Sequence, residues 1–218
     1  MQLFLDTANL SDIKKYAALG IVDGITTNPT LIAKEGASLE KRIKEIAEVV
    51  DGPISAEVTA TNLKEMINEG RKIAKWHPNV YVKVPSTSEG LQAVKIFKSE
   101  NIRTNTTLVF SASQALLAAK VGADFVSPFI GRLDDISEPG MDLIADIVKI
   151  FKNYNFATKV LVASIRHPRH IVEAALIGAD IATMPAEVME KLIHHPLTDL
   201  GLEKFLKDWR AQAKKLRA

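Results

Sequence analysis

Val121-Gly122-Ala123-Asp124 ends a segment with helical spacing and leads into the apolar run Phe125-Val126. The same turn returns as Ile177-Gly178-Ala179-Asp180, and Leu19-Gly20 ends an earlier segment in a similar way. These glycines are separated by 102 and then 56 residues, which correspond to four and two units of about 26 to 28 residues. We predict that each glycine adopts a positive φ at a helix C-terminus, immediately before a strand. The chain is therefore expected to repeat a strand–helix unit.

Short apolar runs recur at intervals of about 25 to 30 residues, and each is followed by a longer segment with helical spacing. Eight such units in 218 residues average about 27 residues each, close to the smallest size in which an eight-unit barrel closes. We therefore predict an α/β fold, a single (β/α)8 TIM barrel domain that spans residues 1–218. The predicted strands are Gln2–Asp6, Val22–Thr26, Ile54–Val58, Val80–Val84, Arg103–Val109, Asp124–Phe129, Lys159–Ala163 and Asp180–Met184.

The end of the chain, residues 198–216, is predicted to form an additional C-terminal helix that the barrel does not require. Thr198 would cap this helix, and one helical stripe carries its apolar residues. The stripe can pack on its own barrel, or it can dock on a neighbouring subunit and make a homo-oligomer. Its members are Leu202, Phe205, Leu206, Trp209 and Leu216.

Another helix has clear start and stop signals near the N-terminal third of the chain. Ser38 is a good N-cap, and Asp51-Gly52-Pro53 stops the segment. The face between them includes one charged residue, Arg42, beside Ile43 and Ile46. This pattern predicts an amphipathic helix.

Composition excludes several classes of protein. The chain has no Cys, so disulfides, thiolate metal sites and a Cys nucleophile are excluded, and a reducing cytoplasm is the expected location. Its 28 basic and 26 acidic residues are interspersed, with a net charge of +2, which argues against a nucleic-acid partner. Residues 1–7 lack the features of a signal peptide, and no uncharged apolar run reaches about 18 residues, so we expect no membrane association.

Lys83 lies within the predicted strand Val80-Tyr81-Val82-Lys83-Val84-Pro85. Alternation places it on the face opposite the valines, in a sheet that should be covered on both faces. Its amine can extend to the barrel mouth or pair with a carboxylate. Alternatively, burial lowers the pKa of the amine from about 10.4 and leaves a neutral nucleophile that forms an imine with a carbonyl. Carboxylates nearby would raise that pKa, and the sequence does not decide between the two effects.

Polar residues gather at the carboxyl ends of the predicted strands. In a barrel this end carries the functional loops, whereas structural polar residues would show no such bias. Each also has a structural interpretation: Asp6 or Asn9 can cap the first helix, Asn28 can form a turn before Pro29, and Ser164 can cap a later helix. The group consists of Asp6, Asn28, Glu57, Asn105, Thr107, Ser127 and Ser164.

Two arginines, Arg132 and Arg166, follow the sixth and seventh predicted strands. An arginine beside the N-terminus of a helix is a good phosphate receptor. The alternative is a surface ion pair, for example between Arg132 and Asp134 or Asp135. Because no glycine-rich nucleotide loop is present, a small phosphorylated molecule fits better than a dinucleotide.

The histidines do not form a metal-binding motif, and no carboxylate cluster accompanies them. We interpret them as helix-end or surface residues and expect no metal site. They are His77, His167, His170, His194 and His195.

Six motifs occur in order along the chain. They are Phe4-Leu5-Asp6-Thr7-Ala8, Gly24-Ile25-Thr26-Thr27-Asn28-Pro29-Thr30-Leu31, Val82-Lys83-Val84-Pro85, Asn105-Thr106-Thr107-Leu108-Val109-Phe110, Val126-Ser127-Pro128-Phe129-Ile130-Gly131-Arg132 and Ala163-Ser164-Ile165-Arg166. Together they resemble the transaldolase family, in particular its short microbial members, and the resemblance extends from Gln2 into the C-terminal helix. It implies a (β/α)8 barrel with a Schiff-base lysine on the fourth strand, at Lys83.

The resemblance also implies a transferase reaction of the pentose phosphate pathway and a role for each site residue. Lys83 would form a Schiff base with a ketose phosphate, and Asp6 would take a proton while a carbon–carbon bond breaks. A dihydroxyacetone unit would then pass to an aldose phosphate without metal or organic cofactor. Glu57 and Thr107 match a water-holding pair. Asn28, Asn105 and Ser127 match ligands of sugar hydroxyls, and Arg132, Ser164 and Arg166 match the phosphate-binding set.

Two alternatives to a transaldolase remain at this stage. A close subfamily resembling fructose-6-phosphate aldolase has Gln in place of Glu57 and Tyr in place of Phe129, and this chain has the transaldolase residue at both positions. Because Phe129 offers no hydroxyl proton, we favour transfer over simple cleavage. The other alternative is a non-catalytic sugar-phosphate binder. Short family members resemble ring-shaped pentamers or decamers, so we expect a homo-oligomer.

Overall fold

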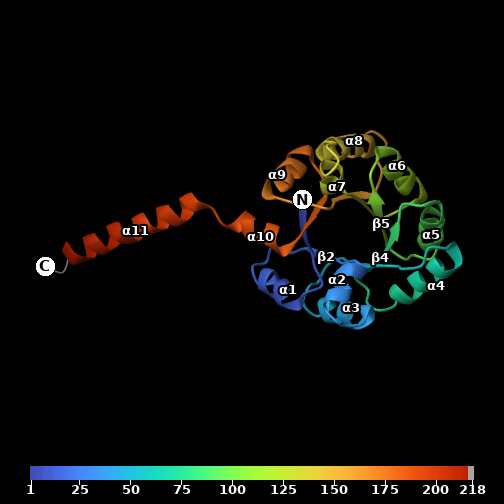
Figure 1. The fold of residues 1–218 in the computed structure, drawn as a ribbon, viewed down its shortest axis with the longest axis horizontal. Helices are drawn as coiled ribbons and strands as arrows, with labels where there is room; N and C mark the ends of the chain where they lie inside the picture. Colours follow the sequence, from blue (N-terminus) through green and yellow to red (C-terminus); the bar gives the residue numbers. More distant parts are fainter. Residues whose placement is uncertain (216–218) are drawn as a thin grey trace.

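A computed structural model describes residues 1–215, and the side chains of residues 1–212. Its eight strands, β1 to β8, pair in parallel with their sequence neighbours, and β8 returns to β1 to close a barrel (Figure 1). The predicted TIM barrel is therefore confirmed. The strands are β1 Gln2–Asp6, β2 Gly24–Thr26, β3 Ile54–Glu57, β4 Val80–Pro85, β5 Thr104–Val109, β6 Phe125–Pro128, β7 Lys159–Val162 and β8 Ile181–Met184.

Helices form a ring outside the strands, and α11 alone extends away from that ring (Figure 1). Within residues 1–215, no helix combines the length and the apolar content needed to cross a membrane. The helices are α1 Leu10–Ala17, α2 Pro29–Lys34, α3 Leu39–Ala47, α4 Leu63–Ile73, α5 Ser88–Ser99, α6 Ala112–Val121, α7 Ile130–Asp134, α8 Gly140–Asn153, α9 Pro168–Ile177, α10 Ala186–Ile193 and α11 Pro196–Lys215.

The repeated glycine turn closes helices at the lower end of the barrel, where the strands begin. Gly20, Gly122 and Gly178 have φ values of +69°, +91° and +90°, as predicted. The aspartate that follows each turn also has a role that the pattern alone did not reveal. The carboxylates of Asp23, Asp124 and Asp180 accept hydrogen bonds of 2.8–2.9 Å from backbone N–H groups at the start of a neighbouring strand. Gly122 and Gly178 are the C-caps of α6 and α9, whereas Gly20 lies two residues after Ala18, the C-cap of α1. Each copy of the turn also ties two strands together.

The second strand is shorter than predicted, because it begins at Gly24 rather than Val22. A Cβ at Gly24 would lie 2.6 Å from the Phe4 ring and 2.7 Å from the Pro53 carbonyl, so only glycine fits there. The other strand ends differ from the predictions by one residue or not at all.

The barrel interior is apolar at its lower end. Phe4, Phe125, Leu161 and Ile181 are buried there, and the Tyr81 ring stacks on Phe125 with centroids 4.4 Å apart. Alternation places these side chains on the same strand faces as Asp6, Lys83 and Ser127, two residues further along. The lower interior is therefore occupied by apolar side chains, and the polar inward-facing residues of the same strands lie nearer their carboxyl ends.

The C-terminal helix starts earlier than predicted, and the structure excludes one of the two alternatives left open for its apolar stripe. It begins at Pro196 rather than after Thr198, because proline suits the first helical position, and Thr198 lies inside the first turn. It does not pack on its own barrel, since Leu202, Phe205 and Trp209 are 57%, 71% and 71% exposed. Leu216, the last predicted member of the stripe, lies outside the described residues.

Candidate active site

A cavity of ≈ 270 Å³ lies at the carboxyl ends of the strands. Parallel strands present this end of the barrel to their following loops, where barrel enzymes place their catalytic groups. The cavity brings together eight of the eleven residues predicted from the sequence, namely Asp6, Asn28, Lys83, Ser127, Phe129, Arg132, Ser164 and Arg166. Of the other three, Glu57 contacts Lys83, Asn105 contacts Ser127, and Thr107 lies on the neighbouring strand β5.

Lys83 projects from β4 into this cavity and is 5% exposed. Its Nζ donates a hydrogen bond of 3.0 Å to the Thr27 carbonyl and lies 3.0 Å from Glu57 Oε2. The pairing of β3 with β4 places Glu57 beside Lys83, so the ion pair follows from the strand register. The amine therefore does not extend into bulk water, and it pairs with a carboxylate, as one of the structural interpretations predicted. In this pair the amine still faces the cavity, where a bound molecule can contact it.

Asp6 ends β1, and its carboxyl is enclosed by the neighbouring strands. Burial raises the pKa of Asp6 above its usual value, while the charge of Lys83 and a hydrogen bond from Thr26 act in the opposite direction. Thr26 Oγ1 donates to Asp6 Oδ1 at 2.7 Å and lies 2.7 Å from Thr183 Oγ1. Because the Thr26 proton is directed at Asp6, Thr183 is the donor in the second bond. A chain of two buried hydroxyls thus supports the carboxyl.

The sequence analysis did not identify Thr26 or Thr183. Threonine is common in strands for packing reasons, so neither residue stands out in the sequence. The available signal was strand parity, since Thr26 and Thr183 are the last inward-facing positions of β2 and β8.

Asn105 and Ser127 form a second hydrogen-bonded group across β5 and β6. Ser127 Oγ donates to Asn105 Oδ1 at 2.7 Å, and Asn105 Nδ2 donates to Ser55 Oγ at 3.0 Å. All three side chains are buried. The chain of bonds fixes the Asn105 amide, and Ser55 is a further residue that the sequence analysis missed.

Thr107 is buried on β5, and its Oγ1 has no hydrogen-bond partner among the described residues. The residue after it, Leu108, has φ of +56°, in the left-handed region, and the pairing of β5 with β6 shifts register there. The irregularity redirects the end of β5 relative to its neighbours. A buried hydroxyl without a protein partner can bind a water molecule or a ligand.

Two arginines, Arg132 on α7 and Arg166 after β7, line the cavity. The guanidinium of Arg132 lies over the Phe129 ring, 5.4 Å from its centroid. Arg166 pairs instead with Asp135, with Nη2 and Oδ2 2.8 Å apart. The surface ion pair considered as the alternative is therefore found for Arg166, whereas Arg132 pairs with neither Asp134 nor Asp135 among the described residues.

Gly131 allows the segments that carry these arginines to meet. A Cβ at Gly131 would lie 2.2 Å from the Ser164 carbonyl and 2.5 Å from Arg166 Nε. Ser164 itself has φ of +62°, in the left-handed region. It does not cap the following helix, because His167 is the N-cap of α9. The close approach of the two segments directs both arginines to one side of the cavity.

His170 lies in the first turn of α9, which agrees with its interpretation as a helix-end residue, and its side chain is buried rather than at the surface. Its Nε2 is 3.3 Å from Asp134 Oδ2, and its Nδ1 accepts a weak bond of 3.4 Å from the Arg166 N–H. Burial and the charge of His167 lower its pKa. His170 therefore contacts the backbone that carries Arg166 rather than the cavity.

A sequence profile described as "Transaldolase/Fructose-6-phosphate aldolase" matches residues 3–217 of this chain. The chain belongs to that family. It is similar to a "Probable transaldolase" of Kosmotoga olearia, with 60% identity over 98% of both proteins. Proteins with the same description from Aquifex aeolicus and Petrotoga mobilis are 60% and 58% identical, over 96% of this chain and 96% and 95% of their own lengths. The family assignment therefore agrees with the resemblance found in the sequence motifs.

Proposed function

We propose that this chain is a transaldolase of the pentose phosphate pathway. It transfers a three-carbon dihydroxyacetone unit from fructose 6-phosphate or sedoheptulose 7-phosphate to erythrose 4-phosphate or glyceraldehyde 3-phosphate. One observation carries the proposal: the buried amine of Lys83 lies 3.0 Å from Glu57 and faces a cavity that Asp6 and two arginines also line. The relatives described as "Probable transaldolase" support the choice of this reaction.

The reaction begins when Lys83 Nζ attacks the C2 carbonyl of the ketose phosphate. The carbinolamine loses water and becomes a protonated imine. Glu57 lies 3.0 Å from Nζ, and the Thr107 hydroxyl has no hydrogen-bond partner in the described part of the chain, so we assign both to the proton transfers of this step and to its water.

The carbon–carbon bond then breaks between C3 and C4. Asp6 takes the proton of the C4 hydroxyl, the bond electrons pass to the iminium, and the aldose phosphate leaves an enamine on Lys83. The enamine C3 then attacks the acceptor aldehyde, and Asp6 returns the proton to the new hydroxyl. Because burial raises the pKa of Asp6, its carboxylate is a stronger base than an exposed one. Hydrolysis of the imine finally releases the new ketose phosphate.

The remaining residues are assigned to substrate binding. Arg132, Ser164 and Arg166 bind the phosphate, for which guanidinium groups are well suited. Asn28 binds hydroxyls near the bond that breaks. Asn105 and Ser127 bind the C1 hydroxyl through the hydrogen-bonded group that holds the Asn105 amide. Arg166 has to exchange Asp135 for the phosphate when the substrate binds.

Glu57 and Phe129 support transfer over simple aldol cleavage. Glu57 is placed to accept protons from Lys83, and Phe129 packs against the rings and guanidinium around it without a hydroxyl to donate. Without that donor, protonation and release of the enamine as free dihydroxyacetone are slow, and an aldehyde acceptor captures it instead.

Borohydride trapping tests the Schiff base directly. Incubation with fructose 6-phosphate and borohydride, followed by peptide mass spectrometry, is expected to place an adduct on Lys83. The absence of an adduct would favour the non-catalytic sugar-phosphate binder. Product formation is then compared with and without erythrose 4-phosphate. Comparable turnover without the acceptor would favour the fructose-6-phosphate aldolase alternative.

The exposed stripe of α11 supports a homo-oligomer, for which we propose a pentamer or decamer. Leu202, Phe205 and Trp209 cover one side of a helix that its own barrel does not bury. Light scattering on a chain truncated near Pro196 tests this assembly. A smaller mass than that of the full chain is expected, and an unchanged mass would show that α11 is not the contact.

Two further expectations remain predictions. The chain is expected to behave as one domain over residues 1–218, which limited proteolysis would test by the absence of large stable fragments. Because it has no Cys, a cytoplasmic location is expected.

A further inference from the structure

Arg42 is a buried charge outside the cavity. Together with Lys83 it is one of two Lys or Arg residues that are less than 9% exposed among residues 1–212. Lys83 faces the cavity, whereas Arg42 lies on α3 and does not line it. On the neighbouring helix α4, the inward positions are the apolar residues Met66 and Ile73. On α3, Arg42 therefore places a charged group on the inward face, where α4 places apolar residues.

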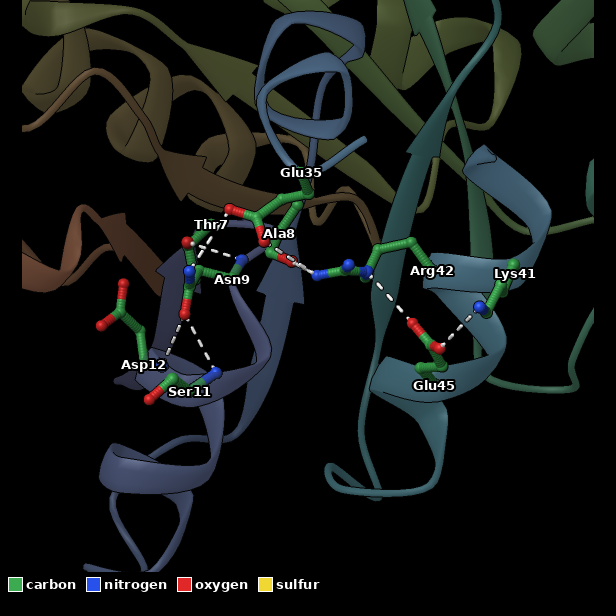
Figure 2. Close-up of polar contacts among 9 residues, drawn as sticks. All are labelled: Thr7, Ala8, Asn9, Ser11, Asp12, Glu35, Lys41, Arg42 and Glu45. Carbon is green, nitrogen blue, oxygen red and sulfur yellow. Dashed lines mark hydrogen bonds and ion pairs between the residues drawn. The ribbon is translucent and has the colours of Figure 1, made fainter. Parts of the chain in front are cut away.

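The guanidinium of Arg42 joins three segments (Figure 2). Nη1 donates to the Ala8 carbonyl at 2.5 Å and to Glu35 Oε2 at 3.1 Å. Nε lies 3.1 Å from Glu45 Oε2, an ion pair whose geometry is not that of a hydrogen bond. Ala8 belongs to the loop after β1, and Glu35 is the C-cap of α2. Arg42 therefore connects the β1–α1 loop with the end of α2.

A second link joins the same two segments. Asn9 Nδ2 donates to Glu35 Oε1 at 3.3 Å, so Glu35 binds Arg42 with one oxygen and Asn9 with the other. The Asn9 side-chain oxygen caps α1 by accepting from Ser11 N and Asp12 N. The loop after β1 is thereby held at three points: the Ala8 carbonyl, the Asn9 side chain and the capped start of α1 (Figure 2).

Both connected segments carry residues of the cavity. Asp6 is two residues before Ala8, and Asn28 is the N-cap of α2, whose other end carries Glu35. Asp6 and Asn28 line the same cavity. A shift of either segment relative to the other would change the distance between the proton acceptor and the group proposed to bind the hydroxyls near the breaking bond.

We propose that Arg42 is a positioning residue for the carbon–carbon bond cleavage, because it holds the β1–α1 loop against α2 and so sets Asp6 relative to Asn28. This inference rests on the proposed function. Replacing a buried ion pair by apolar residues is often neutral for stability or even stabilising, so stability alone does not require a charged Arg42. Directional bonds to a carbonyl and a carboxylate do fix geometry, and a misplacement of about 1 Å can cost on the order of 100-fold in rate.

The test separates two steps of the reaction. Imine formation depends on Lys83 and Glu57, whereas bond cleavage depends on Asp6 and Asn28. In Arg42→Met we expect kcat for transfer to fall about tenfold or more, while the rate of borohydride trapping at Lys83 stays within about twofold of that of the native chain. Arg42→Lys keeps a cation that can donate to the Ala8 carbonyl and is expected to recover part of kcat.

Asn9→Ser provides a variant that keeps the fold of this region. Serine is also a good N-cap, so α1 remains capped, but the donor to Glu35 is lost. A smaller loss of kcat is expected, about two- to fivefold, again without loss of trapping. Arg71→Met is the matched control, because Arg71 pairs with Glu100 on the exposed surface, and neither rate should change.

Different results overturn this proposal and the proposed function. If the native chain forms no adduct at Lys83, the proposed function is wrong. If the native chain forms the borohydride adduct at Lys83 and transfers the three-carbon unit, but Arg42→Met and Asn9→Ser keep the native kcat, only the positioning role is wrong. A parallel loss of trapping and kcat in folded Arg42→Met would also overturn it, because a general loss of site structure would then account for the defect. Should Arg42→Met fail to fold, unchanged kcat in Asn9→Ser overturns the proposal.

Discussion

The two ends of the barrel interior are built by the same strands but differ in chemistry. At the lower end, Phe4 and Phe125 fill the interior with aromatic rings, and no more than 3% of either residue is exposed. Two residues further along the same strands, Asp6 and Ser127 border the cavity. The same change occurs on β4, from Tyr81 to Lys83. A single step of strand periodicity therefore separates the part that stabilises the barrel from the part that carries the chemistry.

This difference predicts that substitutions at the upper end affect turnover and that those at the lower end affect stability. The largest effect is expected for Lys83→Met. Turnover should fall on the order of 10⁴-fold or more, because the Schiff base cannot form. Steady-state transfer from fructose 6-phosphate to erythrose 4-phosphate measures this loss.

Lys159→Met is the matched control for Lys83→Met. Lys159 is exposed at the lower end of β7, and its replacement should leave turnover unchanged. Lys83→Met should also still bind inorganic phosphate, as measured by calorimetry, because both phosphate-binding arginines remain. If the turnover of Lys83→Met stayed within tenfold of that of the native chain, both the proposed mechanism and the assignment of the chemistry to the upper end of the barrel would be contradicted.

Asp6→Asn should slow bond cleavage by about 10²- to 10⁴-fold, since the amide cannot accept the proton. Imine trapping at Lys83 should continue, because that step does not use Asp6. Single-turnover kinetics combined with borohydride trapping distinguish the two steps. Loss of both together would assign Asp6 a role in binding rather than in cleavage.

Asp6→Asn is also expected to increase the free energy of unfolding at neutral pH. Because burial raises the pKa of Asp6 in the folded protein, the carboxyl contributes most to stability when protonated, below its usual value of 3.8. That contribution is lost as the pH rises through the folded-state pKa, whereas an amide does not titrate. Urea denaturation at several pH values should show a gain for the variant at neutral pH that disappears in acid. A variant less stable than native at neutral pH would contradict the direction of the shift.

Phe125→Ala tests the lower end. Removal of a buried phenylalanine should destabilise the barrel by about 3–5 kcal/mol, because it leaves a cavity beside the Tyr81 ring. Turnover per folded molecule should stay close to native, since the cavity at the upper end keeps its residues. Urea denaturation and transfer assays under native conditions measure the two effects. A loss of turnover without a loss of stability would show that the two ends are not separate in function.

Thr183→Val is expected to have the smallest effect. It removes the donor to Thr26, costs about 1 kcal/mol and lowers turnover a few-fold, because the hydrogen-bonded support of Asp6 is weakened. Thr104→Val is the matched control. The Thr104 hydroxyl is buried and has no hydrogen-bond partner among the residues that the structure describes, so its removal should leave turnover unchanged and stability equal or higher. Equal effects of the two substitutions would argue against a specific role for Thr183.

The order of the elements could be predicted from the sequence because their signals are local. Apolar runs, the cap at Ser38 and the positive φ of Gly122 depend on neighbouring residues only. The start of the last helix was predicted two residues late, because the signal of Thr198 was given more weight than that of Pro196. Lys83 could be identified as a candidate for the same local reason, since a lysine between strand valines is unusual.

The support of the site could not be predicted, because it depends on contacts between distant segments. Thr26 meets Thr183 across 157 positions of the sequence, and its hydroxyl has a role only because β8 closes the barrel beside β1. Arg42 was recognised only as one member of a helical face, and its bond to the Ala8 carbonyl exists only once α3 packs against the loop after β1.

The amino-acid sequence alone determined the eight-unit rhythm, the turns that end its helices and the polar residues that follow its strands, because each is a property of a short stretch of chain. Only the tertiary structure decided which of these residues meet. The register of β3 against β4 places Glu57 beside Lys83, and barrel closure places Thr26 between Asp6 and Thr183, while α11 remains off its own barrel. The physical reason is that hydrogen bonds, ion pairs and burial depend on distances in space, which strand register and helix packing set.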